Sequence, residues 1–332
     1  MLSTAHRRRL PLRRAPASAG PWRIAVLMGG IGSEREVSLV SGSEVARALS
    51  ERGHAVTEVV LDSSDDSALD AIPEDTECVF LALHGEYGED GTIQQSLARR
   101  GLCYTGSGPE ASARAFDKIR AKRLFARAGL PLAEQRVLRF PFDRRSVRHT
   151  MRMLESGTYV VKPARAGSSV GISICTTRGE LEEALWAGAA HRQDLLVERF
   201  VPGHELTCGV LGRDALPVVE AIPQNGFYDY QAKYDKAQGT TYAVDPEHLP
   251  LHLRQAIQEM ALMAHEVLGC DDFSRTDFRY DPKRDELVVL ETNTIPGLTP
   301  TSLLPKGAAA RGIDFGMLVE RICRLSLNMA VR

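Results

Sequence analysis

Short apolar runs alternate with longer mixed segments over the first hundred residues. Three of these runs have the length and composition of buried β-strands: residues 22–28, 55–61 and 78–83. Ser33 and Glu36 have the spacing of a capping box, which predicts a helix from there to about residue 51, and a shorter helix is expected at 91–100. Strands that alternate with helices are typical of a parallel sheet covered by helices. Ligands of such sheets bind where strands end, and there the chain places Glu34 and His84.

From about residue 107 the pattern changes to a mixture of helices and shorter strands. Helices are expected at residues 115–128, 180–190, 251–268 and 315–327. Strands are expected at residues 159–162, 170–175, 194–200, 206–211 and 216–222. A Gly/Ser loop at 163–169 joins two of these strands, and a longer loop covers 224–238. The chain is therefore expected to be an α/β protein.

A polar hairpin near the C-terminus is the strongest candidate for chemistry. The apolar run 287–290 predicts a buried strand, and Glu291 and Asn293 follow it at alternate positions, so both side chains point the same way. Residues 278–280 predict its partner strand, and the short turn between them would bring Asp277 beside Glu291. Such a set of oxygens suits Mg²⁺ shared with nucleotide phosphates. The alternative is that these acids are ordinary surface charges at strand ends.

Composition narrows the class of protein. The chain has 332 residues, 43% of them hydrophobic, which is enough for a large core and two or three domains. Its net charge of −2 gives no electrostatic argument for binding nucleic acid or an anionic membrane, and no apolar run is long enough to span a bilayer. The six cysteines contain no CxxC pair, which favours thiols in a reducing compartment and hence a cytoplasmic protein.

Residues 1–20 differ from the rest of the chain. They contain five arginines and no acidic residue, and they lack the continuous apolar core of a secretory signal. This composition has some of the character of an organelle transit peptide, but a disordered basic tail or a start codon placed too early is the preferred interpretation.

A second group of residues can hold a polyphosphate. Lys118 and Lys162 supply ammonium groups, and the loop 167–169, which includes Ser168, supplies backbone N–H groups and hydroxyls. Taken singly, a lysine at a strand end is usually only solvated. The segment 30–35 lacks the last glycine of a dinucleotide fingerprint, and no GxxxxGK[ST] occurs, which argues against NAD and against a P-loop.

Four further residues and one loop can each be interpreted structurally or functionally. Glu198 and Glu205 bracket a strand end and turn, which is either a hinge for adenine and ribose or a solvent-facing acidic strand end. Glu34 is either a dipole-stabilising acid or the anchor of a substrate ammonium group, and a lone His84 is by default structural. The tyrosines and lysine of loop 227–234 form either a lid over a small ligand or a pinned surface loop.

Nine segments in the part of the chain from residue 21 to residue 325 stand out as motifs: GGIGSEREVSLVSG (29–42), LHGEYGEDGTIQ (83–94), YTGSG (104–108), DKIRAK (117–122), VKPARAGSSVG (161–171), VERFVPGHELT (197–207), FYDYQAKY (227–234), SRTDF (274–278) and ETNTIPGLTPTSLLP (291–305). In content and in order they resemble the D-alanine–D-alanine ligases of the ATP-grasp fold. Each segment alone is a weak signal, but accidental coincidence of all nine is negligible.

The resemblance implies a three-domain ATP-grasp fold with a Rossmann-like N-terminal domain at 21–106, a central ATP-grasp domain at 107–197 and a C-terminal domain with the metal site at 198–330. It also implies a reaction in which ATP phosphorylates one D-alanine and a second D-alanine attacks the acyl phosphate, forming D-alanyl-D-alanine for peptidoglycan synthesis. ATP and two Mg²⁺ or Mn²⁺ ions would be required, and the family suggests a cytoplasmic homodimer.

Site roles follow by position from the same resemblance. Roles toward ATP and metal fall on Asp277, Glu291 and Asn293 as metal ligands, Lys118, Lys162 and Lys233 as phosphate-binding lysines, Glu198 and Val201 as the adenine hinge, and Glu205 as the ribose contact. Roles toward the amino acids fall on Glu34 for the first ammonium group, His84 near its carboxylate, Ser168 and Tyr234 for orienting the anchor and lid, Arg275 and the Gly297 N–H for the oxyanion, and Ser302 and Leu303 for the second carboxylate.

Two rivals remain open at this point. One is another ligase of the same fold, such as a D-alanine–D-lactate enzyme, although Tyr234 resembles the dipeptide-forming members. The other is a non-catalytic nucleotide-binding module. Ala166 stands where some relatives have an acid, which leaves any lid contact made through that acid in doubt.

Overall fold

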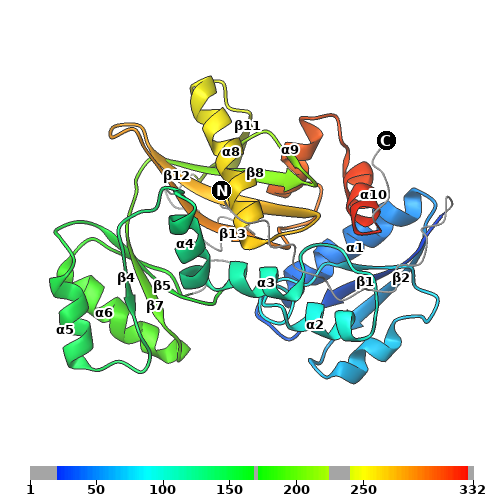
Figure 1. The fold of residues 1–332 in the computed structure, drawn as a ribbon, viewed down its shortest axis with the longest axis horizontal. Helices are drawn as coiled ribbons and strands as arrows, with labels where there is room; N and C mark the ends of the chain where they lie inside the picture. Colours follow the sequence, from blue (N-terminus) through cyan, green and yellow to red (C-terminus); the bar gives the residue numbers. More distant parts are fainter. Residues whose placement is uncertain (1–20, 168–170, 224–239, 328–332) are drawn as a thin grey trace, which may run out of the picture.

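The structure, a computed structural model, describes residues 21–167, 171–223 and 240–327. Its strands form three separate sheets, each with its own helices (Figure 1). Residues 1–20, the loop residues 168–170, the whole of the predicted lid loop at 224–238 and the C-terminal residues 328–332 lie outside the described residues. The predicted basic tail, Ser168, Lys233 and Tyr234 are therefore not among the positions described below.

The N-terminal sheet is parallel, as the alternation of strands and helices predicts. Its strands β1 (Arg23–Gly29), β2 (Ala55–Leu61) and β3 (Cys78–Leu81) lie in the order β2-β1-β3. The accompanying helices are α1 (Arg35–Glu51), η1 (Asp66–Ala71) and α2 (Thr92–Arg99). After its first residue every residue of β1 is buried, because neighbouring strands and helices cover both its edges and faces.

The start of α1 differs from the prediction. Glu34 occupies the N-cap position and no side chain caps the helix, so the predicted capping box of Ser33 and Glu36 is wrong. A turn closed by the Arg35 N–H and the Gly32 carbonyl, 3.2 Å apart, precedes the helix instead. One turn further on, the Ser38 hydroxyl accepts from the Gly29 N–H and donates to the Ala82 carbonyl, so tertiary contacts with β1 and the segment after β3 hold this end.

The second sheet has four antiparallel strands. They lie in the order β4 (Gln135–Leu138), β7 (Leu195–Arg199), β5 (Tyr159–Pro163) and β6 (Ser173–Cys175). Helices α5 (Arg144–Arg152) and α6 (Arg178–Gly188), followed by the short η2 (Ala189–His191), belong to the same part of the chain. A true capping box, formed by Thr177 and Glu180, starts α6. None of the helices and strands predicted from the sequence corresponds to β4 or α5.

The third sheet has six strands. Five of them follow the order β11 (Thr241–Val244), β10 (Val219–Ile222), β8 (His204–Leu211), β12 (Phe273–Asp281) and β13 (Glu286–Asn293), and β9 (Asp214–Ala215) pairs with β8. Helices α8 (Leu251–Leu268), α9 (Leu303–Ala309) and α10 (Phe315–Ser326) complete this part of the chain. The predicted hairpin is confirmed as β12 and β13, and α8 has the predicted bounds.

The predicted helix at residues 115–128 is divided into two helices in the structure. Instead of a continuous helix over 115–128, the chain forms α3 (Pro109–Phe116) and α4 (Lys118–Arg127). Asp117 breaks the helix because its carboxylate accepts from the Ile119 and Arg120 N–H groups, both at 3.1 Å, and so caps α4. The break makes Lys118 the first residue of α4. Both new helices pack against the third sheet, α3 on β13 and α4 on α8 and β13.

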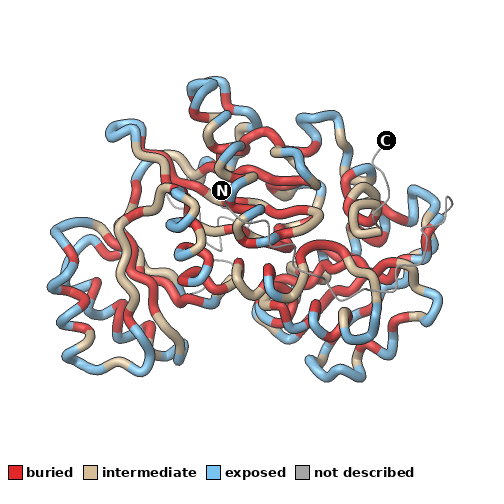
Figure 2. The backbone as a smooth tube through the Cα atoms, in the orientation of Figure 1, coloured by how far each residue is buried: buried red, intermediate tan, exposed pale blue. Residues whose placement is uncertain are grey.

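Buried backbone follows the strands of the sheets (Figure 2). One core cluster joins segments far apart in the chain, since Val45 and Leu49 of α1 pack with Leu318 and Ile322 of α10. The domain boundaries stay a prediction. Within the described residues, none of the helices combines the length and the hydropathy that a membrane crossing needs.

Candidate active site

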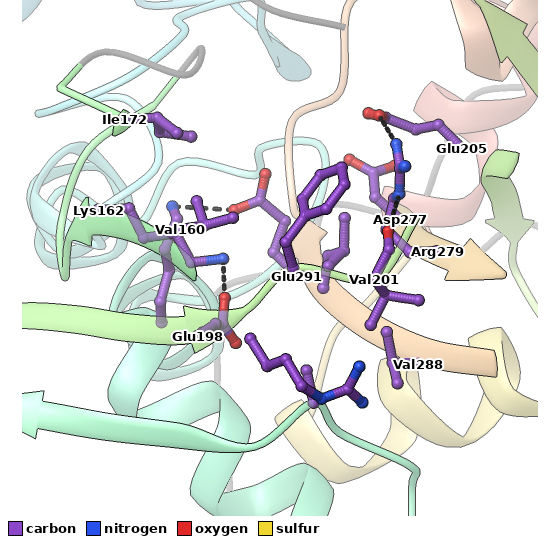
Figure 3. A pocket seen from close by; sticks show the side chains of 15 residues that line it. Val160, Lys162, Ile172, Glu198, Val201, Glu205, Asp277, Arg279, Val288 and Glu291 are labelled. Atoms are coloured by element: carbon purple, nitrogen blue, oxygen red, sulfur yellow. Dashed lines mark hydrogen bonds and ion pairs between the residues drawn. The ribbon is translucent and has the colours of Figure 1, made fainter. Parts of the chain in front are cut away.

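A cleft lies between the four-stranded and six-stranded sheets (Figure 3). Its walls surround about 740 Å³ of space, a volume that includes open solvent. Apolar side chains line one part of it: Ala133, Val160, Ile172, Phe200, Val201, Val288 and Leu290. Charged side chains line the rest: Lys118, Lys162, Glu198, Arg199, Glu205, Asp277, Arg279 and Glu291. An apolar slot beside convergent charges can hold a flat base next to a polyphosphate.

Two lysines share one buried carboxylate at the base of the cleft. Lys162 on β5 and Lys122 on α4 each form an ion pair with Glu198 on β7, one at each carboxylate oxygen. All three side chains are at least nine-tenths buried. Burial raises the pKa of Glu198, but the two ammonium groups overcome this and hold the pKa below its usual value. Lys122 was missed by the sequence analysis, although it ends one of the family segments.

The two lysines respond differently to the same carboxylate. Burial lowers the pKa of Lys122. Burial acts in the same direction on Lys162, but Glu198, Glu291 and Glu205 together raise the pKa of Lys162 above its ordinary value. Lys162 therefore keeps its charge where phosphate oxygens would meet it.

The predicted metal ligands converge on one face of the β12–β13 hairpin. Asp277 pairs directly with Glu291 because Leu290 is skipped in the register, so that Phe278 pairs with Val289. This β-bulge turns the acids toward the cleft, as bulges near functional sites do. The amide Nδ2 of Asn293 donates to Asp277 Oδ2 at 3.1 Å, which brings the third oxygen-bearing residue to the same point.

Cations surround these oxygens. Arg275 donates to both oxygens of Asp277, at 2.7 and 2.8 Å, and Lys118 Nζ lies 2.9 Å from Glu291 Oε2. Lys118 also donates to the Ala166 carbonyl at 2.7 Å, which ties α4 to the Gly/Ser loop. Two carboxylates and an amide form a hard-oxygen donor set, which fits Mg²⁺, and the adjacent cations would neutralise phosphate charge.

Arg279 organises the hinge at residues 200–205. Its buried guanidinium donates to the Val201 carbonyl at 2.9 Å, the Gly203 carbonyl at 3.2 Å and Glu205 Oε2 at 3.0 Å. It also lies 5.1 Å from the ring centroid of Phe200. These contacts hold the hinge backbone and the Glu205 carboxylate at the wall of the cleft. From the sequence, this arginine is predicted only as part of a strand.

Glu34 and Glu89 form an acidic pair next to the metal-ligand face. A small cavity lined by Glu89, Gly167 and Asn293 shares Lys118 and Glu291 with the main cleft. The backbone at Gly167 approaches the Glu34 carboxylate so closely that a Cβ there would collide with it. The loop that follows β5 therefore lies against Glu34, the predicted ammonium anchor in the N-terminal part of the chain.

Glu89 was missed by the sequence analysis. It is buried, it accepts a hydrogen bond from the Gly85 N–H at 2.9 Å, and burial together with the nearby Glu34 charge raises its pKa to about 8. The signal that could have found it is its place in HGEYGED, an acid just after a strand that ends in His-Gly.

His84 is buried and has a partner for each ring nitrogen. Nδ1 lies 3.1 Å from the Ile295 carbonyl, and Nε2 lies 3.0 Å from the Ser41 hydroxyl. Because a carbonyl only accepts, Nδ1 carries the proton and Nε2 accepts from Ser41. Burial lowers the pKa of His84 to about 4, so it is neutral near pH 7.

The predicted site for the second amino acid lies in the segment after β13. Ser302 Oγ accepts from the Thr299 N–H at 3.1 Å and lies 2.8 Å from the Thr299 hydroxyl, forming a tight polar turn. Gly297 lies against Ser302, since a Cβ built on Gly297 would meet its Oγ at 3.0 Å. Leu303, the first residue of α9, is buried. This turn continues from the strand that bears Glu291 and Asn293.

Two antiparallel sheets that enclose a cleft, with lysines on one side and acids of a hairpin on the other, define the ATP-grasp class, and this chain has that fold. Residues 124–324 match the family model described as D-ala D-ala ligase C-terminus. Over 296 residues, 89% of this chain and 95% of the relative, the sequence is 45% identical to the D-alanine–D-alanine ligase of Acidiphilium cryptum. The chain belongs to the D-alanine–D-alanine ligase family.

Solved structures agree with this assignment. The D-alanine–D-alanine ligase from Bacillus anthracis complexed with ATP superposes with a TM-score of 0.79 and 28% identity, over 92% of this chain and 98% of that one. The VanG D-Ala:D-Ser ligase from Enterococcus faecalis superposes with a TM-score of 0.78, also at 28% identity, over 92% of this chain and all of that one. The resemblance inferred from the sequence motifs is thus confirmed.

Proposed function

We propose that this enzyme joins two D-alanines to D-alanyl-D-alanine, with ATP converted to ADP and phosphate, for peptidoglycan precursor synthesis. The observation that carries the proposal is the convergence of buried Lys162 and of Lys118 with Asp277, Glu291 and Asn293 in one cleft. The family relatives named for this activity, matched over nearly their whole length, support it.

ATP would lie with its base in the apolar part of the cleft. There the Val201 backbone and the Glu205 carboxylate, both held by Arg279, offer hydrogen bonds to adenine and ribose, with Glu198 beneath them. Lys118 and Lys162 would neutralise the phosphates, and Lys233 is proposed to reach them from the lid. Asp277, Glu291 and Asn293 would hold two Mg²⁺ or Mn²⁺ ions, which when bound spread the negative charge that develops on the transferred phosphate.

The first D-alanine would bind with its ammonium group at Glu34. Its carboxylate oxygen attacks the γ-phosphorus of ATP, the bond to the leaving ADP oxygen breaks, and an acyl phosphate results. His84, neutral and hydrogen bonded at both nitrogens, would shape this end rather than carry charge. We propose that Ser168 and Tyr234 orient Glu34 and the lid, which excludes water from the acyl phosphate.

The second D-alanine would be held by its carboxylate at Ser302 and Leu303. Its free amine attacks the acyl carbon and loses a proton, and the tetrahedral intermediate expels phosphate to leave the peptide bond. Arg275 and the Gly297 N–H are proposed to stabilise the oxyanion of that intermediate, as charged and backbone donors do in acyl transfer.

Phosphate release with mass identification of products tests the proposal. The enzyme is given ATP and Mg²⁺ with D-alanine, with L-alanine, or with D-alanine plus D-lactate or D-serine. Release with D-alanine alone, yielding the dipeptide, is expected. Release that needs D-lactate or D-serine would move the enzyme to another branch of the fold, as the VanG relationship illustrates. ATP binding without any release would favour the non-catalytic module.

Two finer properties are also proposed. The use of ATP, together with six cysteines that are all free thiols, supports a cytoplasmic location. A homodimer is proposed from family membership, and sedimentation-equilibrium ultracentrifugation at micromolar concentration should give twice the chain mass.

A further inference from the structure

Two histidines and a buried glutamate meet on the third sheet, away from the cleft. Glu220 on β10 lies between His204 on β8 and His248, which precedes α8. His204 Nδ1 is 2.6 Å from Glu220 Oε1, and His248 Nε2 is 2.9 Å from Glu220 Oε2. One ligand atom from each of the three residues lies within 4.8 Å of the other two.

We propose that these three residues form a site for a divalent transition-metal ion of the Zn²⁺ class. Two imidazole nitrogens and one carboxylate are the ligands of many open zinc sites, in which water fills the fourth position. Mg²⁺ prefers all-oxygen ligands, so the site is chemically distinct from the Asp277 cluster.

The geometry needs only a small adjustment. Ligand atoms around a tetrahedral zinc ion stand about 3.4 Å apart, as follows from bond lengths of about 2.1 Å. The distance between His204 Nδ1 and Glu220 Oε1 is that of a hydrogen bond, whereas His248 Nε2 lies near Oε2 without forming one. A metal ion would bind between these nitrogens and the carboxylate while the nitrogen–oxygen separations of 2.6 and 2.9 Å widen by less than about 1 Å. His248, with 52% of its side chain exposed, leaves the open position accessible to water.

The burial and hydrogen bonding of the Glu220 carboxylate support a bound metal ion. Its side chain is only 6% exposed, and among the described residues no hydrogen bond reaches Oε2, although His248 Nε2 lies close to it. A buried carboxylate oxygen without a hydrogen bond is costly unless a cation is bound there. A metal ion shared with the two histidines would satisfy it.

The site lies on the α8 face of the sheet, opposite the nucleotide. His204 pairs with Tyr280 and Glu220 pairs with Leu206, and both Tyr280 and Leu206 pack in the core cluster of α8. Adjacent residues of a strand point to opposite faces, so Glu205 faces the cleft. A metal ion at this site would therefore connect β8, β10 and the segment before α8 without taking part in the joining of the two amino acids.

Zinc titration of the untagged, full-length enzyme tests the proposal. The protein is stripped of metal by a chelator, dialysed, and titrated with Zn²⁺ in excess Mg²⁺, which keeps the Asp277 cluster out of the measurement. One Zn²⁺ per chain is expected to bind, and His248→Asn should weaken binding by at least about tenfold. The matched control His252→Asn removes an exposed histidine at the start of α8 and should bind as the wild type does.

Two further measurements keep the test independent of folding. At about 100 times Kd, Zn²⁺ should raise the Tm of the wild type by about 4 °C and leave that of Glu220→Gln unchanged. Co²⁺ should give visible d–d bands without thiolate charge transfer. No zinc binding, equal binding by His248→Asn, or a thiolate spectrum from the cysteines would each overturn the proposal.

Discussion

Glu198→Gln leaves two buried ammonium groups, those of Lys122 and Lys162, facing a neutral amide. The substitution keeps the shape of the side chain but removes the charge that both lysines share. Breaking a buried ion pair by removing one partner costs about 3–5 kcal/mol, because the remaining charge is left uncompensated. We therefore expect the variant to fold with clearly reduced stability.

The expected shift in melting temperature follows from the length of the chain. An unfolding entropy of about 2.1 cal/mol/K per residue over 332 residues gives about 0.70 kcal/mol/K. A loss of about 3–5 kcal/mol then lowers Tm by about 4–7 °C. Because burial lowers the pKa of Lys122, raising the pH removes its proton more readily and should shrink the deficit.

Differential scanning calorimetry without nucleotide measures the shift. The matched control is Glu51→Gln, which removes a carboxylate paired with Arg47 on the exposed face of α1 and should leave Tm within about 1 °C of the wild type. The double variant Glu198→Gln/Lys122→Met should be more stable than Glu198→Gln alone, because it removes one uncompensated charge.

Three results would refute this reasoning. A Tm for Glu198→Gln within about 1 °C of the wild type would show that the carboxylate does not hold the two charges. An equal loss in the Glu51 control would point to a general effect of amide substitution. A double variant less stable than the single one would mean that Lys122 stabilises the fold in another way.

Three more predictions follow from the site. Glu291→Gln should lower kcat at least about tenfold at saturating ATP while Tm changes little, measured by phosphate release across Mg²⁺ concentrations; wild-type turnover would contradict the metal assignment. Arg275→Ala should lower kcat more than it raises the KM for ATP, since its proposed partner carries charge formed during the reaction, whereas an effect on KM alone would exclude that role. Because the pKa of Glu89 rises from 4.5 to about 8 on folding, the folded state holds a proton that the unfolded state has lost, and wild-type stability should fall as pH rises between these values. Denaturant unfolding should show a flatter profile for Glu89→Gln, and an unchanged slope would contradict the raised pKa.

Local patterns were sufficient for the elements that build the metal-ligand face. The apolar run before Glu291, the alternation of Glu291 with Asn293 and the short turn back toward Asp277 place three oxygens together over a few residues. The structure pairs Asp277 with Glu291, as predicted. The bulge at Leu290 was not foreseen, because a skipped residue leaves the apolar pattern of the strand unchanged.

The missed residues have their partners far away in the chain. Lys122 on α4 meets Glu198 on β7, 76 residues further along the chain (198 − 122 = 76). Arg279 holds a hinge more than 70 residues upstream (279 − 205 = 74), and the pKa of Glu89 is raised partly by Glu34. None of these residues differs by type or spacing from an ordinary surface charge. The break between α3 and α4 depends on the Asp117 side chain, which accepts hydrogen bonds from the first N–H groups of α4. An aspartate at this position is compatible both with such a cap and with a continuous helix, so the sequence pattern alone does not distinguish the two.

The sequence by itself determined the family and its fold through the nine segments that resemble its members. It also determined the residues that meet within one hairpin, because strand periodicity and short turns act over a few residues. Only the tertiary structure decided the order of strands in the sheets, the sharing of Glu198 by two lysines and the meeting of His204, Glu220 and His248. These contacts depend on how whole sheets and helices pack, and packing selects partners by shape and burial over distances that no local pattern records.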